Sequence, residues 1–563
     1  MGRIRHIDSY VFSVLAALLV ALSGAAPARA QGSFVNFETG PVRPLALSPD
    51  GSRLFVVNPP DSQLEFFAVA PGALRHQGWV RVGLEPPAVA ARNDSEVWVV
   101  NHLSDSVSIV EVAADPPRVV RTLLTCDEPR DIVFAGPGDS RAFVTTARRG
   151  QNCGAGSISD LTTPGIGRAV VQVWDAESLG NGPRGNILAN VVLFGDTPRA
   201  LARSADGNTV YAAVFHSGNQ TTALNEGWVC DGGANAPPCI VAGGRTAPGG
   251  LPAPNQNFEG HPGPEVGLIV KLNRDLGIWA DPIGRDWSDV VRFDLPDLDV
   301  FAIDAAAAVP AESAAFAHVG TVLFNMVANP VSGKVYVSNT EARNEVRFEG
   351  PAIFGGPDAT TVQGRLHEAR ITVLDGTDVL PRHLNKHIDY TIRPAPPGTA
   401  AHSLATPLDM VVSADGGTLY VAAFGSSKIG VFDTSALEAD SFVPSAAEHI
   451  DLPGGGPTGL VLDESRDQLY VATRFDNSVA VIDLGTRAVV DRAALHDVEP
   501  AAVTAGRRFL YDARLTSSNG EASCSSCHVF GDLDSLAWDL GNPDDEVLNA
   551  PLPFRIPPLP PVP

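Results

Sequence analysis

The stretch PLDMVVSADGGTLYVAAFGSSKIGVFD (407–433) decides the fold. An apolar strand after Pro407 is followed by the turn pair Asp415-Gly416, a second apolar and aromatic strand, a polar turn and an alternating third strand. The D-G pair supplies the positive-φ positions of a tight hairpin turn. Alternating apolar residues on either side are typical of strands that are covered on one or both faces. The stretch therefore predicts consecutive antiparallel strands joined by short turns.

The same pattern recurs along most of the chain. The other six copies are PLALSPDGSRLFVVN (44–58), PAVAARNDSEVWVVNHLSDSVSIVEV (87–112), PRDIVFAGPGDSRAFVTT (129–146), PRALARSADGNTVYAAVFHSGN (198–219), NPVSGKVYVSNT (329–340) and PTGLVLDESRDQLYVATRFDNSVAVID (457–483). The turn residues Asp50, Asp94 and Asp139 are 44 and 45 positions apart. That period allows four short strands per copy, which is the size of a propeller blade. We therefore predict an all-β propeller of seven blades over residues 31–497, with eight blades as the alternative.

Three strand ends carry a resemblance to a known family. They read Phe55-Val56-Val57-Asn58, Trp98-Val99-Val100-Asn101 and Tyr336-Val337-Ser338-Asn339. These phrases resemble the YVTN family of β-propeller repeats, and the likeness covers roughly residues 34–485. The resemblance implies the propeller fold but no particular activity, because propellers host many unrelated functions.

The first thirty residues are typical of a bacterial secretory signal peptide. Arg3 and Arg5 give a positive start, Val11 to Leu22 is a nearly uninterrupted apolar run, and Ala28-Arg29-Ala30 is an A-x-A cleavage pattern. An uncleaved membrane anchor is the alternative. No other run approaches the roughly 20 apolar residues that a membrane helix needs. We therefore expect a mature chain without a membrane span, located in the periplasm or outside the cell.

Composition limits the partners. The chain of 563 residues has 40 Lys and Arg against 64 Asp and Glu, a formal net charge of -24. Nucleic-acid binding needs a cationic footprint, so this acidic balance excludes that class of partner. It suits the docking of a basic redox partner. The 54 Gly and 46 Pro are too many for a helical bundle and fit a protein of many turns.

Segments 147–170 and 217–265 are rich in Gly, Pro, Asn and Ser, and we predict long loops there. Each holds or borders a pair of cysteines. In an exported protein the simplest pairings are Cys126–Cys153 and Cys230–Cys239. The other two ways of pairing these four cysteines remain open. A metal site is a further alternative, although the C-x-x-C spacing is lacking.

Several histidines lie in the central repeats. His216 ends a strand in VFHSGN, where loops converge on one rim of a propeller. A histidine in that position is either a ligand or acid–base group, or a turn residue bonded to the backbone.

Residues 524–528 read Cys-Ser-Ser-Cys-His, the C-x-x-C-H pattern of c-type haem attachment. Two cysteines three apart lie on one helical face and reach the two vinyl groups of one haem. His528 is then the proximal ligand of the iron. A disulfide loop beside a histidine is the alternative, whereas a thioredoxin-like motif lacks its βαβ context here. We therefore predict haem c attached covalently at Cys524 and Cys527.

The sequence around the motif carries a second resemblance. RRFLYDARLTSSNGEASCSSCH (507–528) resembles the entry to the haem domain of the bacterial dihaem cytochrome c peroxidase and MauG group. The matching residues are Phe509, Tyr511, Asp512, Arg514, Leu515, Asn519, Gly520, Ser523, Cys524, Cys527 and His528. The likeness implies covalent haem, electron transfer and, in some members, peroxide reduction.

Residues 498–563 depart from that group. The chain has one C-x-x-C-H where the group has two, and no His or Met follows His528 as a sixth ligand. Only 35 residues remain, ending in PLPFRIPPLPPVP. We expect a short, incomplete α-helical cytochrome c segment. Either the chain is a truncated piece of a longer protein, or the propeller supplies the missing haem wall.

Carboxylates cluster after the motif. They are Asp532, Asp534, Asp539, Asp544, Asp545 and Glu546. Such oxygen ligands could hold Ca²⁺, but the spacing is not that of an EF-hand, and a solvated acidic loop is the alternative. Trp538 packs either on a haem edge or in a small core.

Three functions follow from these patterns. The first is an exported haem protein that exchanges electrons with a redox partner protein or a small molecule, with the propeller as docking or scaffold module. The second is a haem oxidoreductase of the cytochrome c peroxidase type, which needs an open distal site with an acid–base group. The third is a binding or surface propeller whose haem segment is vestigial.

Overall fold

The computed structural model describes residues 36–153, 166–252, 267–291, 297–348, 362–392 and 394–540. The expected signal peptide lies outside these ranges. Within them, no helix combines the length and the apolar character that crossing a membrane requires. Residues from Glu38 onward belong to one compact unit, so the repeats and the C-terminal segment are not separated into two bodies.

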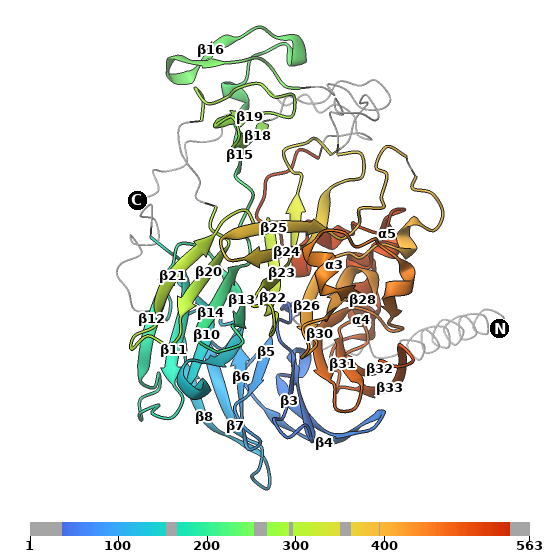
Figure 1. The fold of residues 1–563 in the computed structure, drawn as a ribbon. Helices are drawn as coiled ribbons and strands as arrows, with labels where there is room; N and C mark the ends of the chain where they lie inside the picture. The colour runs from blue at the N-terminus through green and yellow to red at the C-terminus, as the bar shows by residue number, and fades with distance from the viewer. Residues whose placement is uncertain are drawn as a thin grey trace, which may run out of the picture. The chain divides into compact units, whose positions relative to one another are not determined.

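The described residues form seven four-stranded antiparallel sheets, and each repeat copy found in the sequence falls on one of them (Figure 1). The first two sheets contain β1 (Leu45–Leu47), β2 (Arg53–Asn58), β3 (Gln63–Ala70), β4 (Ala73–Arg81), and β5 (Ala88–Ala91), β6 (Glu96–Asn101), β7 (Ser106–Glu111), β8 (Arg118–Leu124). The third and fourth contain β9 (Ile132–Ala135), β10 (Arg141–Ala147), β11 (Ala169–Asp175), β12 (Ile187–Leu193), and β13 (Pro198–Arg203), β14 (Thr209–Val214), β20 (Val300–Asp304), β21 (Ala311–Phe316). The fifth contains β22 (Val322–Ala328), β23 (Val335–Ala342), β24 (His367–Asp375) and β25 (Asp378–His383). The last two contain β26 (Pro407–Val412), β27 (Thr418–Ala423), β28 (Lys428–Asp433), β29 (His449–Asp451), and β30 (Pro457–Asp463), β31 (Gln468–Thr473), β32 (Ser478–Asp483), β33 (Ala488–Ala494).

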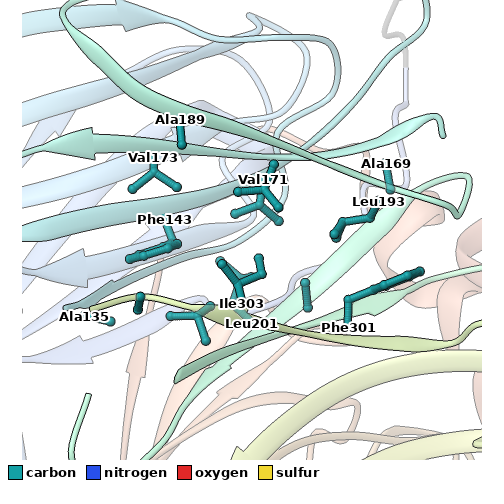
Figure 2. Packing of buried hydrophobic residues seen from close by; sticks show 14 of the residues in the cluster. Ala135, Phe143, Ala169, Val171, Val173, Ala189, Leu193, Leu201, Phe301 and Ile303 are labelled. Carbon is teal, nitrogen blue, oxygen red and sulfur yellow. The ribbon is translucent and has the colours of Figure 1, made fainter. Parts of the chain in front are cut away.

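The first strands of the sheets contact one another in chain order, and β30 of the last sheet returns to β1 of the first. Apolar side chains fill the space between neighbouring sheets. Phe143 of the third sheet and Leu201 of the fourth belong to one such core (Figure 2). Tyr470 of the seventh sheet and Leu54 of the first belong to another, which closes the ring. A closed ring of four-stranded sheets is the propeller architecture that the repeat predicted.

A short hydrogen-bond pattern repeats in the hairpin turns. Ser48 Oγ donates to Asp50 Oδ1 at 2.6 Å, and Gly51 follows with a φ of 69°. The N–H of Arg53 donates back to Ser48 Oγ at 2.9 Å. The same bonds recur at Ser204–Asp206 and Ser413–Asp415. The S-x-D-G phrase of the sequence therefore forms these turns through its own side chains.

Buried carboxylates link the first strands of neighbouring sheets. Asp131 Oδ1 accepts from the N–H of Ile132, and Asp131 Oδ2 accepts from the N–H of Leu201 in the next sheet, both at 2.8 Å. Asp409 Oδ2 likewise accepts from the N–H of Leu460 in the next sheet at 2.9 Å. The Pro-x-Asp opening of these repeat copies therefore fixes the spacing of successive sheets.

The insertion within the fourth sheet corrects one expectation. The composition of residues 217–265 predicts a long loop, but the described residues of that range belong to a small β-module. Its strands are β15 (Thr221–Leu224), β16 (Cys239–Val241), β17 (Arg245–Ala247), β18 (Leu268–Asn273) and β19 (Ile278–Ala280). The module has its own core, in which Trp279 and Trp287 are buried. In the other expected loop, the described residues between Ala147 and Ala169 form no strand.

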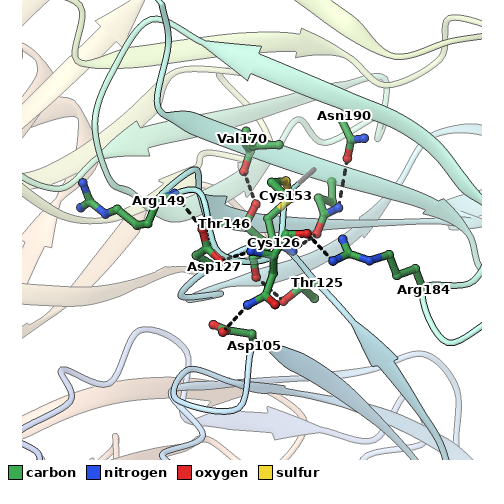
Figure 3. Close-up of a disulfide and its surroundings, with 12 residues drawn as sticks. Asp105, Thr125, Cys126, Asp127, Thr146, Arg149, Cys153, Val170, Arg184 and Asn190 are labelled. Carbon is green, nitrogen blue, oxygen red and sulfur yellow. Dashed lines mark hydrogen bonds between the residues drawn. A yellow bond between two sulfur atoms is a disulfide. The ribbon is translucent and has the colours of Figure 1, made fainter. Parts of the chain in front are cut away.

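Two disulfides are present, and they are the simplest pairings that the sequence predicted. Cys126–Cys153 joins the start of the third sheet to the loop after β10 (Figure 3). The N–H of Arg149 in that loop donates to Asp127 Oδ2 at 2.7 Å. Cys230–Cys239 closes a loop inside the module.

The described part of the C-terminal segment, residues 498–540, contains helices, as expected. They are α4 (Ala501–Tyr511) and α5 (Ala513–Thr516), accompanied by the 3₁₀ turns η9 (Cys524–Ser526) and η10 (Val529–Gly531). The other described helix is α3 (Thr434–Glu438), and the other 3₁₀ turns are η1 (Pro59–Asp61), η2 (Pro137–Asp139), η3 (Glu226–Trp228), η4 (Gly233–Asn235), η5 (Ala242–Gly244), η6 (Thr399–Ala401), η7 (Phe424–Ser426) and η8 (Ala446–Glu448).

Candidate functional site

Helix α4 attaches the C-terminal segment to the ring through a buried ion-pair network. Arg507 Nη2 lies 2.5 Å from Glu38 Oε1 and 2.6 Å from Glu499 Oε1. Arg474, just after β31, lies 2.9 Å from the same oxygen of Glu499. Burial alone would raise the pKa of Glu499, but the two arginines lower it overall. The network joins residues that precede the first sheet to residues that follow the last.

Phe530, in η10, packs against aromatic side chains of several sheets. Its ring centroid lies 6.1 Å from that of Phe215 and 6.2 Å from that of Phe424. The guanidinium carbon of buried Arg199 lies 4.7 Å from the centroid of the Phe530 ring. A Cβ atom at Gly40 would lie only 2.4 Å from the same ring. The C-terminal segment is therefore packed into the ring and is not a loose appendage.

The motif, Cys524 to His528, presents its chemical groups to solvent. Cys524 and His528 are exposed and Cys527 is half-buried, whereas Ser525 and Val529 are buried. Neither cysteine is part of a disulfide. The buried residues fix the segment, while the Cys524 thiol and the His528 imidazole are accessible and the Cys527 thiol is partly covered.

Cys527 is the more buried of the two thiols. Burial, together with the nearby Asp534 and Cys524, raises the pKa of the Cys527 thiol to about 12. This thiol is therefore protonated at physiological pH.

A buried carboxylate three positions before Cys524 joins the segment to the fifth sheet. Glu521 Oε1 lies 2.8 Å from His383 Nε2 and accepts from Asn385 Nδ2 at 3.0 Å, while Oε2 accepts from the Tyr390 hydroxyl. Burial opposes ionisation, yet the bond and charge of His383 lower the pKa of Glu521 to about 2. Sequence reasoning missed this residue. The sequence feature that could have indicated Glu521 is its place as one acidic residue within the small-residue stretch SSNGEASC.

Asp534, a weak candidate from the sequence, supports the motif from the other side. Its N–H donates to the carbonyl oxygen of Cys527 at 2.9 Å. Its carboxylate accepts from Trp538 Nε1 at 2.8 Å and from the N–H of Leu536 at 3.0 Å. Burial raises the pKa of Asp534. Both Asp534 and Trp538 are thus used in local packing.

The expected acidic cluster contributes no metal site within the described residues. Asp532 is exposed. Across the ranges that the structure covers, no group of three or more His, Cys, Asp or Glu is arranged to hold a metal ion. Asp544, Asp545 and Glu546 lie outside those ranges.

His216 lies beside Phe215, with ring centroids 4.1 Å apart, and forms an isolated bridge with Val322. Burial, followed by the charges of Arg130 and Arg199, lowers the pKa of His216 to about 4. The imidazole is therefore neutral at physiological pH. Its Nδ1 is buried without a hydrogen-bond partner among the described residues.

The C-terminal segment also exposes large apolar side chains. Four of them keep between 46% and 65% of their surface in solvent: Phe509, Leu515, Leu533 and Leu540. Exposed apolar residues that are scattered singly are ordinary on protein surfaces.

The residues of the motif fit a covalently held haem. Two free thiols three positions apart form the attachment pair, and the accessible imidazole beside the second has the chemistry of an axial ligand. The attachment pair and one axial donor therefore lie within Cys524–His528.

No family model matches the chain, and no curated protein sequence matches it. Solved structures of β-propeller proteins do match. Hydrazine synthase of Kuenenia stuttgartiensis is 17% identical with a TM-score of 0.50, covering 80% of this chain and 98% of that one. The periplasmic gluconolactonase of Pseudomonas aeruginosa is 12% identical with a TM-score of 0.39, covering 74% and 86%. Apo AztD from Citrobacter koseri is 11% identical with a TM-score of 0.37, covering 81% and 86%. At these identities the likeness to hydrazine synthase shows the propeller fold alone.

Proposed function

We propose that the protein is an exported c-type haem protein that transfers electrons. Cys524 and Cys527 hold haem c covalently, His528 is the proximal ligand of its iron, and the seven sheets are the blades of a docking scaffold. One observation carries the proposal. Four cysteines are paired in disulfides, while the two of the C-x-x-C-H motif are free, Cys524 exposed and Cys527 half-buried. In an oxidising compartment, two neighbouring thiols without a disulfide are expected to have another covalent use.

Residues next to the motif hold it in position on the propeller. Ser525 and Val529 are buried and fix the backbone of the motif, and Asp534 bonds its end. When bound, the haem supplies a one-electron redox centre. The propeller supplies an acidic surface, since the formal net charge is -24, and such a surface suits a basic electron-transfer partner.

Buried contacts hold the C-terminal segment on the propeller. Arg507 is buried between two carboxylates, and Phe530 contacts buried Arg199. Removing one partner of a buried ion pair is costly, so these contacts give the motif a fixed place on the ring. The two disulfides and the signal-like N-terminus support an extracytoplasmic location.

A redox titration of the full chain tests the proposal. The protein is produced with the haem-attachment machinery of the periplasm and titrated while its visible spectrum is recorded. We expect one reversible one-electron transition. A bound haem that cannot be reduced and reoxidised would contradict the proposal of electron transfer. Turnover of peroxide with a small electron donor would favour the peroxidase-type function instead. Absence of covalent haem would favour the third function, a binding propeller with a vestigial haem segment.

A further inference from the structure

We propose that Glu521 is a positioning residue for the haem-attachment motif. It ties the backbone that leads into Cys524–His528 to the fifth sheet, so that the propeller sets how the motif is presented. This inference rests on the proposed function. Glu521 lies outside the C-x-x-C-H pattern, and haem attachment alone does not require a glutamate at this position.

The groups that hydrogen-bond to the Glu521 carboxylate come from the fifth sheet and the loop that follows it. His383 ends β25, Asn385 and Tyr390 lie in the loop beyond it, and the N–H of Ala369 in β24 donates to Oε1 at 3.2 Å. The Glu521 side chain is 1% exposed. A carboxylate accepts from every one of these groups, whereas an amide would turn its own donors toward some of them.

The backbone just before Glu521 is fixed by residues that precede the first strand of the sixth sheet. Ser403 Oγ donates to the carbonyl oxygen of Asn519 at 2.5 Å, and Asn519 Oδ1 accepts from the N–H of Glu521 at 3.0 Å. Gly520 lies so close that a Cβ there would be 2.8 Å from the Cβ of Ala400. The chain therefore reaches Glu521 along a defined path.

The backbone after Glu521 is fixed as well. The N–H of Ser523 donates to Ser526 Oγ at 3.0 Å, and the hydroxyl oxygens of Ser523 and Ser525 are 2.8 Å apart. The bond between Ser523 and Ser526 belongs to a capping box around η9, which begins at Cys524. A displacement of Glu521 is therefore transmitted to the motif through a short, bonded stretch of chain.

The structure offers a matched control in Glu65 of β3. Like Glu521, Glu65 is a buried glutamate that accepts from an asparagine amide, Asn58 Nδ2 at 2.7 Å, and from a backbone N–H, that of His496 at 3.2 Å. It also lies 3.2 Å from a histidine, His76. None of these partners belongs to the motif, so Glu65→Gln measures the general cost of neutralising such a carboxylate.

The test compares Glu521→Gln with Glu65→Gln in the full chain by hydrogen exchange and by redox titration. We expect exchange of residues 518–528 to rise about tenfold in Glu521→Gln only, because one buried, charge-assisted anchor is weakened. The haem that is still attached should show a shifted midpoint potential. Glu65→Gln should leave both unchanged.

Unchanged exchange at residues 518–528 in Glu521→Gln would overturn the inference, and so would an equal effect of Glu65→Gln. An unchanged midpoint potential beside increased exchange would also overturn it, because Glu521 would then have a structural role only. Lack of covalent haem in the unsubstituted chain would contradict the proposed function instead. The exchange comparison would still be readable in that case, so the two failures are distinguishable.

Discussion

Single buried charges hold the C-terminal segment of this protein in place. Arg507 is paired with two carboxylates, and Glu521 is surrounded by donors. Arg199 instead donates to carbonyl oxygens, those of Phe324 and Pro41, and burial lowers its pKa to about 9. Each of these side chains belongs to a bond that spans a long stretch of sequence.

We expect the C-terminal segment to loosen in acid. The pKa of Glu521 is lowered from an ordinary value of about 4.5 to about 2. The stability that Glu521 contributes is therefore fully present above about pH 4.5 and is lost as the pH falls toward 2, in total about 3 kcal/mol. Hydrogen exchange of residues 518–528 should rise over that interval in the unsubstituted chain. Glu521→Gln should flatten the profile, and equal profiles for the two proteins would contradict the assignment.

The motif was predictable from the sequence, but its support was not. Cys524, Cys527 and His528 are adjacent in the chain, so their spacing alone predicts the chemistry. Glu521 is bonded to His383 and Asn385, which are 138 and 136 positions away. A local sequence pattern cannot predict contacts between residues that are so far apart in the chain.

At the scale of elements, short-range signals predicted the turns and strands. The S-x-D-G and Pro-x-Asp phrases form their bonds with residues nearby or in the next repeat, so the repeat itself reveals them. The β-module was mistaken for a loop because its Trp279 and Trp287 core lies beyond the Gly- and Pro-rich stretch. Its short strands also carry no copy of the repeat.

The contact between Phe530 and Gly40 can be tested with two glycines. Gly40→Ala places a Cβ 2.4–2.7 Å from three atoms of the Phe530 ring, so η10 must move, and we expect a loss of about 1–3 kcal/mol. Gly506 lies in α4 with nothing within 4 Å of an added Cβ, so Gly506→Ala should stabilise the helix by about 1 kcal/mol. Limited proteolysis of the C-terminal segment measures both. Equal resistance of the two variants would show that Phe530 does not need Gly40.

At the scale of the whole molecule, the ring closes without a shared sheet. The first four and the last four strands of the ring form separate sheets. Side-chain contacts join them, and the network of Glu38, Arg507 and Glu499 links the chain before the first sheet to the chain after the last. The C-terminal segment therefore contributes to closing the propeller as well as carrying the motif.

The β-module should lose stability independently of the ring when its disulfide is removed. Removing Cys230–Cys239 by the double change Cys230→Ser and Cys239→Ser opens a loop of nine positions and should cost the module about 2–3 kcal/mol. The fluorescence of buried Trp287 reports on the module. We expect an earlier transition of that signal on heating, with the main unfolding transition unchanged. A single transition that shifts as a whole would show that module and ring unfold together.

Covalent haem attachment is tested most directly by the mass and the pyridine haemochrome spectrum of the full chain, matured with the periplasmic attachment machinery. We predict one haem per chain that survives denaturation, and its loss from the double variant Cys524→Ser and Cys527→Ser. The variant should keep the fold of the ring, because neither thiol is part of a disulfide. An unsubstituted chain that carries no covalent haem under these conditions would contradict the central proposal.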